Sequence, residues 1–432
     1  MKWQAWFLWI FLFSCVDGFI SNWLYPAKLP LLYRDIFILG VYILFLTQES
    51  ASFWIAGLRQ AVGSVVWLFA ACFMWVGIWQ MFNPHLPHFL LGLLGFKILF
   101  FYWPLAVLAY AYAESPETAR RWMKTVVIFS IPISLFGLYQ FSAGPAFLVT
   151  TFGPGFERAT IVAALYETYL PKDTFLRVIG TFASTSQFSV FLVINSMLTF
   201  ALLLTSSSGP ERIRWIAVQL LNFLAMLTTG SRGGLLILGL AFLMMGRFCI
   251  GIGRLIRFGL LAAAGMYLAF HWLGGGVVKR FETLKRFDIL THRTVETTPL
   301  MFAKILKEAP LGKGLGMGSS AARHLVDERG GEEFIVENHL SKMQLETGVV
   351  GTVFFYLLVA ALIRRWMTRW KPLEKYLLAL TGPLSSYCVT LCALSFIIGG
   401  FDSPPGAIFF WALVGMVARL AGSANYEIPH AR

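Results

Sequence analysis

The stretch 274–293, GGGVVKRFETLKRFDILTHR, opens the longest segment of this chain that cannot lie in a membrane. The segment continues to His339 and is dense in charge, whereas almost everything before and after it is apolar. Of the 432 residues, 57% are hydrophobic and only 13% are charged, where a soluble domain has roughly 25% charged residues. With a mean hydropathy of +0.69, this composition is typical of multi-spanning membrane proteins.

Apolar runs of about 20 residues predict about twelve transmembrane helices, because lipid offers no water to backbone groups. The expected spans are 3–24, 33–48, 62–82, 89–113, 122–143, 178–205, 212–229, 233–250, 254–273, 340–363, 374–398 and 404–421. The predicted fold class is an all-α integral membrane protein. We expect nine spans with an outer loop at 144–177 in residues 1–273, a partly helical periplasmic loop at 274–339, and three spans with a cytoplasmic tail in 340–432.

Basic residues in the short loops predict the orientation of the chain. One set of alternate loops holds Arg59, Arg120, Arg121, Lys124, Arg212, Arg214, Arg247, Arg254, Arg257, Arg364, Arg365, Arg369, Lys371 and Lys375. The opposite short loops hold little beyond Lys28, Arg34 and Arg232. The first set is therefore expected to be cytoplasmic, together with both termini, and the two long loops are expected outside. The net charge of +13 then needs no nucleic acid, since no basic soluble domain exists to bind one.

Two arginines stand at the expected outer ends of spans. Arg232, in the sequence Thr-Gly-Ser-Arg-Gly-Gly of residues 229–234, must lie at or just below the membrane surface, where an arginine usually has a partner. A snorkelling anchor is the alternative, but the flanking glycines allow close approach of a ligand. Arg177, before Val-Ile-Gly-Thr-Phe at 178–182, is explained almost as well as an interfacial anchor.

The long outer loop contains a predicted amphipathic helix. Thr298-Pro299 is typical of a helix start, and Pro310 ends the helix. Its apolar stripe consists of Met301, Phe302, Ile305 and Leu306, with Lys304 and Lys307 off the stripe. Arg293 precedes this helix.

The sequence Pro-Leu-Gly-Lys-Gly-Leu-Gly-Met-Gly-Ser-Ser follows at 310–320. Its alternate glycines, including Gly314 and Gly316, could line an anion-binding nest with backbone amides. A plain flexible turn is the alternative. It is not a Walker loop, because the ending Gly-Lys-Ser/Thr is missing.

A polar group closes the loop where the chain re-enters the membrane, at Glu337-Asn338-His339. Histidine is the usual general base near neutral pH, although a lone histidine is more often structural. Glu346 lies two helical turns below, too far to orient the ring directly, and Asp402 is another candidate carboxylate. No His, Cys, Asp or Glu cluster has the spacing of a metal site, so we expect arginines to hold any diphosphate.

Together these motifs resemble the O-antigen ligase and polysaccharide polymerase superfamily. The resemblance rests on Thr229-Gly-Ser-Arg-Gly, Arg293 before a helix, Pro310-Leu-Gly-Lys-Gly-Leu-Gly, and Asn338-His339-Leu340 with Glu346-x-Gly348-x-x-Gly351. It implies a bacterial inner-membrane glycosyltransferase that moves a glycan from undecaprenyl diphosphate to an acceptor hydroxyl on the periplasmic side, without cofactor or metal. Family ligases often have His-Asn where this chain has Asn338-His339.

Residue by residue, the resemblance assigns the diphosphate to Arg232 and Arg293, and acceptor activation to His339. Arg177 matches the arginine of a stretch with Gly-Thr-Phe that many family members have, and we expect it to bind the diphosphate as well. The expected supporting residues are Glu337, Asn338, Glu346, Asp402, Gly314 and Gly316. The acceptor would be a lipid-linked glycan for a polymerase, or a lipid A core or protein for a ligase. We slightly favour a polymerase, because the loop lacks an obvious acceptor-docking domain.

A flippase or other transporter is the alternative function. It predicts ionisable residues inside the bilayer and broken helices. Lys97 is the only basic residue well inside an expected span.

Overall fold

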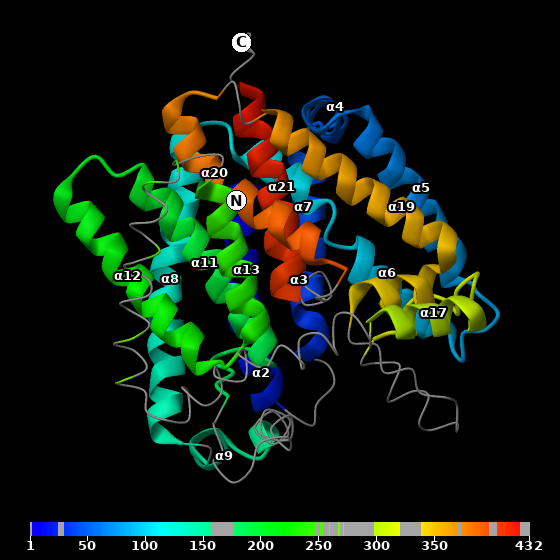
Figure 1. The fold of residues 1–432 in the computed structure, drawn as a ribbon, viewed down its shortest axis with the longest axis horizontal. Coiled ribbons are helices and arrows are strands. Elements are labelled where there is room, and N and C mark those ends of the chain that lie inside the picture. Colours follow the sequence, from blue (N-terminus) through cyan, green and yellow to red (C-terminus); the bar gives the residue numbers. More distant parts are fainter. Residues whose placement is uncertain are drawn as a thin grey trace.

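The computed structural model of the chain describes residues 2–24, 30–144, 146–157, 177–246, 298–319, 338–369, 373–396 and 404–423, and single positions at 251, 253, 259, 267 and 271. Throughout these residues the regular structure is helical, without strands (Figure 1). The helices are α1 (Trp3–Ser14), α2 (Asp17–Trp23), α3 (Pro30–Gln48), α4 (Ala51–Val62), α5 (Ser64–Met81), α6 (Phe89–Phe100), α7 (Leu105–Tyr112), α8 (Pro116–Ala143), α9 (Phe147–Phe152), α11 (Thr185–Leu204), α12 (Gly209–Thr228), α13 (Arg232–Met245), α17 (Thr298–Glu308), α19 (His339–Arg369), α20 (Lys375–Leu394) and α21 (Pro404–Ser423).

Seven helical stretches of the described chain are long and apolar enough to cross a membrane, and up to nine if two bent pairs each count as one span. The seven are Ser64–Met81, Phe89–Tyr112, Pro116–Ala143, Thr185–Leu204, His339–Thr368, Lys375–Leu394 and Pro404–Gly422. The all-helical, multi-spanning prediction is therefore confirmed at this level. The ninth expected span, 254–273, lies almost entirely outside the described residues.

Two expected features near the N-terminus differ from the prediction. The first span is not one helix, because α1 and α2 meet at a bend of 58° after Cys15. The expected loop around Arg59 is instead helix α4, which turns by 103° from α3. Gly63, with φ +96°, ends α4 in a backbone conformation that favours glycine.

The bundle is closed by tight pairings between helices distant in sequence. Helix α21 packs along α7, and α19 packs along α5 (Figure 1). The approach of α21 is so close that a Cβ on Gly415 would fall 2.0 Å from the carbonyl oxygen of Ala106. Small residues at a crossing let membrane helices come this near to one another.

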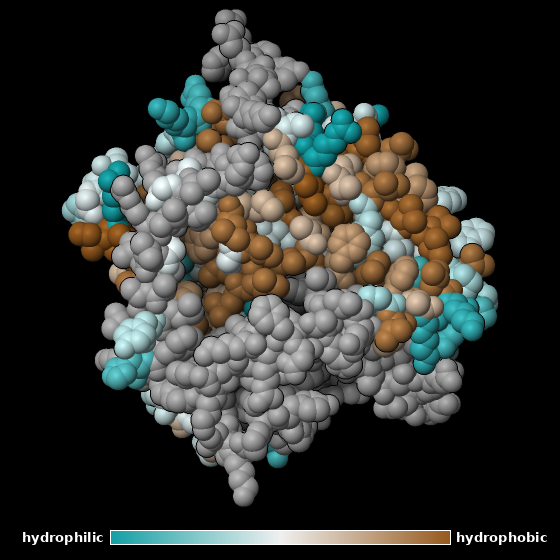
Figure 2. Space-filling model, in the orientation of Figure 1, coloured by the Kyte–Doolittle hydropathy of each residue, from teal (hydrophilic) through white to brown (hydrophobic). Residues whose placement is uncertain are grey.

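The outside of the bundle is apolar where a membrane would surround it. Figure 2 shows apolar side chains across the middle of one face, and hydrophilic ones gathered toward its rims. On α5, Trp75 and Trp79 are 69% and 74% exposed, which is expected of side chains that face lipid. This distribution is the one expected of a helical bundle that lipid surrounds.

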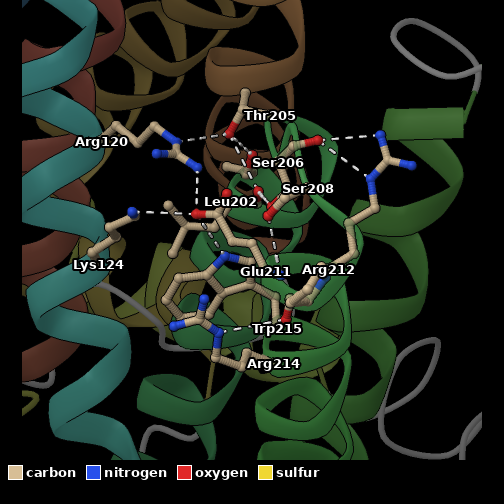
Figure 3. A network of polar contacts seen from close by, with 12 residues as sticks. Arg120, Lys124, Leu202, Thr205, Ser206, Ser208, Glu211, Arg212, Arg214 and Trp215 are labelled. Carbon is tan, nitrogen blue, oxygen red and sulfur yellow. Dashed lines mark hydrogen bonds and ion pairs between the residues drawn. The ribbon is translucent and has the colours of Figure 1, made fainter.

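At one end, a polar network joins α8 to α12 around Glu211 (Figure 3). The Glu211 carboxylate accepts Nη2 of Arg120 at 2.7 Å and Nζ of Lys124 at 3.2 Å. Burial of Glu211 favours its neutral form, but hydrogen bonds and positive charge from Lys124 and Arg120 outweigh this and lower its pKa. Trp215 adds Nε1 at 3.4 Å. These basic residues belong to the loops expected in the cytoplasm.

Candidate functional site

Two predicted arginines are found at the turn between α12 and α13. Arg232 is the first residue of α13, and Nε of Arg177 donates to the carbonyl oxygen of Thr229 at 3.2 Å. Between them Gly230 has φ +59°, in the left-handed region that favours glycine. Arg177 thus binds the backbone of a turn that follows it by two helices in the sequence.

Local hydrogen bonds explain why α13 begins at this turn. The Ser231 hydroxyl accepts the amide of Gly234 at 3.2 Å and so caps the helix. The Ser231 amide in turn donates to Oγ1 of Thr229 at 3.2 Å. A Cβ on Gly234 would lie 1.9 Å from the Ser189 hydroxyl, so α13 packs closely on α11. The start of α13 is therefore fixed in position.

The segment that carries Arg177 is anchored along its length. The Val178 amide donates to the carbonyl of Thr228 at 3.2 Å. The Gly180 amide donates to the side chain of Gln140 on α8 at 3.0 Å. The Thr181 hydroxyl donates to the carbonyl of Cys15 at 2.5 Å. Arg177 is therefore held by a frame built from α1, α8 and α12, which is more than a freely snorkelling anchor needs.

This arrangement suits an anion. Free backbone amides and the macrodipole make a helix N-terminus favourable for negative charge, and α13 begins here. A guanidinium group can donate two parallel hydrogen bonds to a phosphate, and it stays charged at all physiological pH values. The third arginine predicted for the diphosphate, Arg293, lies outside the described residues, as do Glu337 and Asp402.

His339 is the first residue of the long helix α19 and is fully buried. Its ring lies 5.0 Å from that of Phe355, centre to centre. It also lines a small apolar pocket between α5, α6, α19, α20 and α21. The other pocket residues are Phe73, Ile98, Leu99, Trp103, Phe355, Leu358, Val359, Leu362, Cys392, Phe410 and Trp411. The imidazole is thus shielded from bulk water.

Two predicted supporting residues have structural contacts. The Asn338 side chain accepts the amide of Ser341 at 2.7 Å, as the cap of α19. The Glu346 carboxylate accepts the amide of Gly318 at 3.0 Å and lies 4.0 Å from Nζ of Lys342. Glu346 therefore ties the glycine-rich stretch to α19.

The glycine-rich stretch is packed into the protein and does not form an open nest of amides. The amide of Lys313 donates to the carbonyl of Leu345 at 2.7 Å, and that of Leu315 to Gln80 at 3.2 Å. Gly314 and Gly316 have φ values of +105° and +84°. Because glycine has no side chain, these positions can adopt left-handed backbone angles and pack closely. The amides of Lys313 and Leu315 are already hydrogen-bonded within the protein, so this geometry does not match an anion nest.

The amphipathic helix expected in the long loop is confirmed as α17. Ile305 is fully buried and packs with Ala309 and with Leu345 of α19. Lys304 and Lys307 are exposed, as predicted. Figure 1 shows α17 beside the lower part of α19, near the end of the bundle opposite the C-terminus.

Sequence reasoning missed a buried ionic network in α2, α3 and α6. Arg34 pairs with both Asp17 and Asp35, and Asp35 also pairs with Lys97. Arg34 was expected in an outer loop, and Lys97 was expected to be alone in its span. The available signal was two carboxylates, Asp17 and Asp35, inside or beside apolar runs, where isolated charge is costly.

No protein-family model matches this chain, and a search of curated proteins finds no match. Among the described residues, no group of three or more His, Cys, Asp or Glu side chains could hold a metal ion. The function must therefore be argued from the site.

Proposed function

We propose that this protein is a membrane glycosyltransferase of the O-antigen ligase and polysaccharide polymerase type. The observation that carries the proposal is the hydrogen bond from Arg177 to Thr229, which places Arg177 at the turn from which Arg232 begins α13. A turn with two guanidinium groups and a helix N-terminus fits a diphosphate. The donor would be a glycan on undecaprenyl diphosphate.

In the proposed reaction, Arg232, Arg177 and Arg293 hold the diphosphate and stabilise the charge that develops on it as it leaves. His339 takes the proton of the acceptor hydroxyl. The acceptor oxygen forms a bond to the anomeric carbon while the bond from that carbon to the phosphate oxygen breaks. A single displacement of this kind inverts the anomeric configuration, and undecaprenyl diphosphate is released.

The burial of His339 supports transfer to a hydroxyl over hydrolysis. Its ring lies among apolar side chains, including Phe355 at 5.0 Å. Exclusion of water protects a reactive donor from water as a competing acceptor.

In the proposed topology the chain crosses the bacterial inner membrane about twelve times, with both termini in the cytoplasm and the site facing the periplasm. The support is the basic cluster at one end of the bundle. Arg120 and Lys124 lie around Glu211 at one end, whereas α17 and the start of α19 lie toward the other (Figure 1). Basic residues are enriched on the cytoplasmic side of membrane proteins.

The test is glycan transfer by purified protein in lipid nanodiscs, from a defined undecaprenyl-diphosphate glycan. Two acceptors are offered in parallel: a lipid-linked repeat unit and a lipid A core. His339→Ala should abolish transfer, while His85→Ala, which removes an exposed histidine, should leave it within about twofold. Normal transfer by folded His339→Ala protein would refute the role of the base.

The acceptor that receives the glycan distinguishes the two subtypes. Elongation of the lipid-linked unit, which we favour, indicates a polymerase, and product on the lipid A core indicates a ligase.

A lipid-linked glycan flippase is a second candidate, and specific observations favour it. Lys97 and Asp35 form an ion pair within apolar helices, and two N-terminal helix pairs are sharply bent. Buried ionisable groups and broken helices are common in transporters. Movement of a lipid-linked glycan across vesicles, without transfer to either acceptor, would select this candidate and reject the transferase.

A further inference from the structure

The buried network around Arg34 and Asp35 joins three helices. On α3, Arg34 pairs through Nη1 with Asp17 of α2, and Asp35 pairs with Lys97 of α6. The hydroxyl of Tyr102, just after α6, donates to Oδ1 of Asp35 at 3.1 Å and accepts Nη2 of Arg34 at 3.2 Å. The two cations and two carboxylates balance one another.

Two of the four charged side chains in this network have been almost fully taken out of water. The side chains of Arg34 and Asp35 are only 6% and 10% exposed. Removing one member of a buried ion pair leaves the other charge uncompensated, which is far more destabilising than removing both. The network therefore holds α2, α3 and α6 in one arrangement.

Through α2, the network reaches the segment that carries Arg177. The Phe19 amide donates to the carbonyl of Thr181 at 2.8 Å, two residues after Asp17. A Cβ on Gly18 would lie 1.9 Å from the amide nitrogen of Ala183. Helix α2 is therefore hydrogen-bonded to, and closely packed against, the end of segment 177–183.

Through α6, the same network reaches the stretch that leads to α19. A Cβ on Gly95, two residues before Lys97, would fall 2.2 Å from the amide nitrogen of Gly316. A Cβ on Gly316 would fall 2.3 Å from the carbonyl oxygen of Leu91. The stretch is hydrogen-bonded in turn to Leu345 on α19, the helix that begins with His339.

We infer that Asp35, with Arg34, Asp17 and Lys97, is a positioning network that sets the placement of His339 relative to the Arg177–Arg232 turn. This inference rests on the proposed function for its catalytic meaning. The network touches neither of the two groups. It acts through α2 on one side of the site and through α6 on the other. In the proposed reaction, the arginines that hold the diphosphate and the histidine that activates the hydroxyl must be correctly placed relative to each other. A displacement of about 1 Å can lower the rate on the order of a hundredfold.

The test uses the charge-balanced variant Asp35→Asn/Lys97→Met, which removes one carboxylate and one cation together. Asp35→Asn alone leaves a charge uncompensated and would confuse unfolding with misplacement. The matched control is Glu211→Gln/Arg120→Met, which also removes an acid and a base but lies in the network that joins α8 to α12.

The first readout is steady-state glycan transfer. In Asp35→Asn/Lys97→Met we expect kcat to fall at least about tenfold, because His339 and the arginine turn lose their relative placement, and we expect the donor KM to rise as well, because the loosened segment 177–183 carries Arg177. The control should keep both parameters within about twofold. An unchanged kcat in the folded variant would overturn the inference.

The second readout is amide hydrogen exchange, which needs no glycan and so separates this inference from the proposed function. In Asp35→Asn/Lys97→Met, loss of the ion pair should make amide exchange faster in both 177–183 and 311–319. In the control variant, exchange should be unchanged in both segments. Faster exchange in only one segment, or in neither, would show that the network does not couple the two sides. If the wild-type protein transfers no glycan, the proposed function fails and exchange alone decides the coupling.

Discussion

Nε of Arg177 donates a hydrogen bond to the carbonyl oxygen of Thr229 at 3.2 Å, across 52 positions of sequence. This contact joins the segment before α11 to the turn before α13, where Arg232 begins its helix. It places Arg177 at the turn where the proposed donor site begins.

Binding of undecaprenyl diphosphate should weaken when either arginine is removed. We expect Arg232→Ala and Arg177→Ala each to raise the Kd by about tenfold, and Arg232→Lys to recover only part of the loss, because lysine lacks the planar fork. Titration of the protein in nanodiscs with the lipid measures the effect. Arg214→Ala, an exposed arginine at the start of α12, is the control. Equal Kd values for the wild-type protein and all four variants would show that the donor does not bind at this turn.

The cap of α13 should matter for the same site. Ser231→Ala removes the hydroxyl that accepts the Gly234 amide at 3.2 Å, at a cost of about 1 kcal/mol. Ser231→Asp keeps an acceptor but adds negative charge beside the two arginines, so it should restore stability and still weaken diphosphate binding. Thermal unfolding and lipid titration separate the two effects. Tight binding by Ser231→Asp would argue against an anion at this turn.

A side chain at Gly316 should destabilise the protein. Gly316→Ala places a Cβ 2.3 Å from the carbonyl of Leu91 in a residue with φ +84°. Left-handed backbone and overpacking together should cost about 3 kcal/mol. Gly239→Ala is the control, since its Cβ meets no atom within 4 Å in the middle of α13 and alanine favours helix. Melting temperatures should fall for the first variant and hold or rise for the second.

The Glu211 network predicts a pH dependence of stability. The pKa of Glu211 is lowered in the folded protein, so its stabilising effect is full above its ordinary value of 4.5 and is lost as the pH falls through the lower folded value. Glu211→Gln should therefore lower the melting temperature at pH 7, for a loss of about 1 kcal/mol or less, and the difference should disappear in strong acid. A difference that persists unchanged below the folded pKa would show that charge is not the cause.

The sequence by itself determined the features that depend on local patterning. Long apolar runs predicted the spanning helices, because each satisfies its own backbone hydrogen bonds in lipid. The stripe that includes Met301 and Ile305 predicted α17, and Pro310 its end, because amphipathic spacing and the geometry of proline act within a few residues. The candidates Arg177, Arg232 and His339 came from their positions at the ends of spans.

Tertiary structure alone decided which of those residues meet and what the glycines do. The contact of Arg177 with Thr229 and the ion pairs of Asp35 with Lys97 join residues that no local pattern relates. From the sequence, the alternate glycines could form an anion nest or a plain flexible turn, whereas the nearness of Leu91 and Gly95 to Gly316 shows that they serve close packing. The physical reason is that local periodicity specifies which face of a helix is apolar, whereas the partner of that face depends on how all the helices pack together.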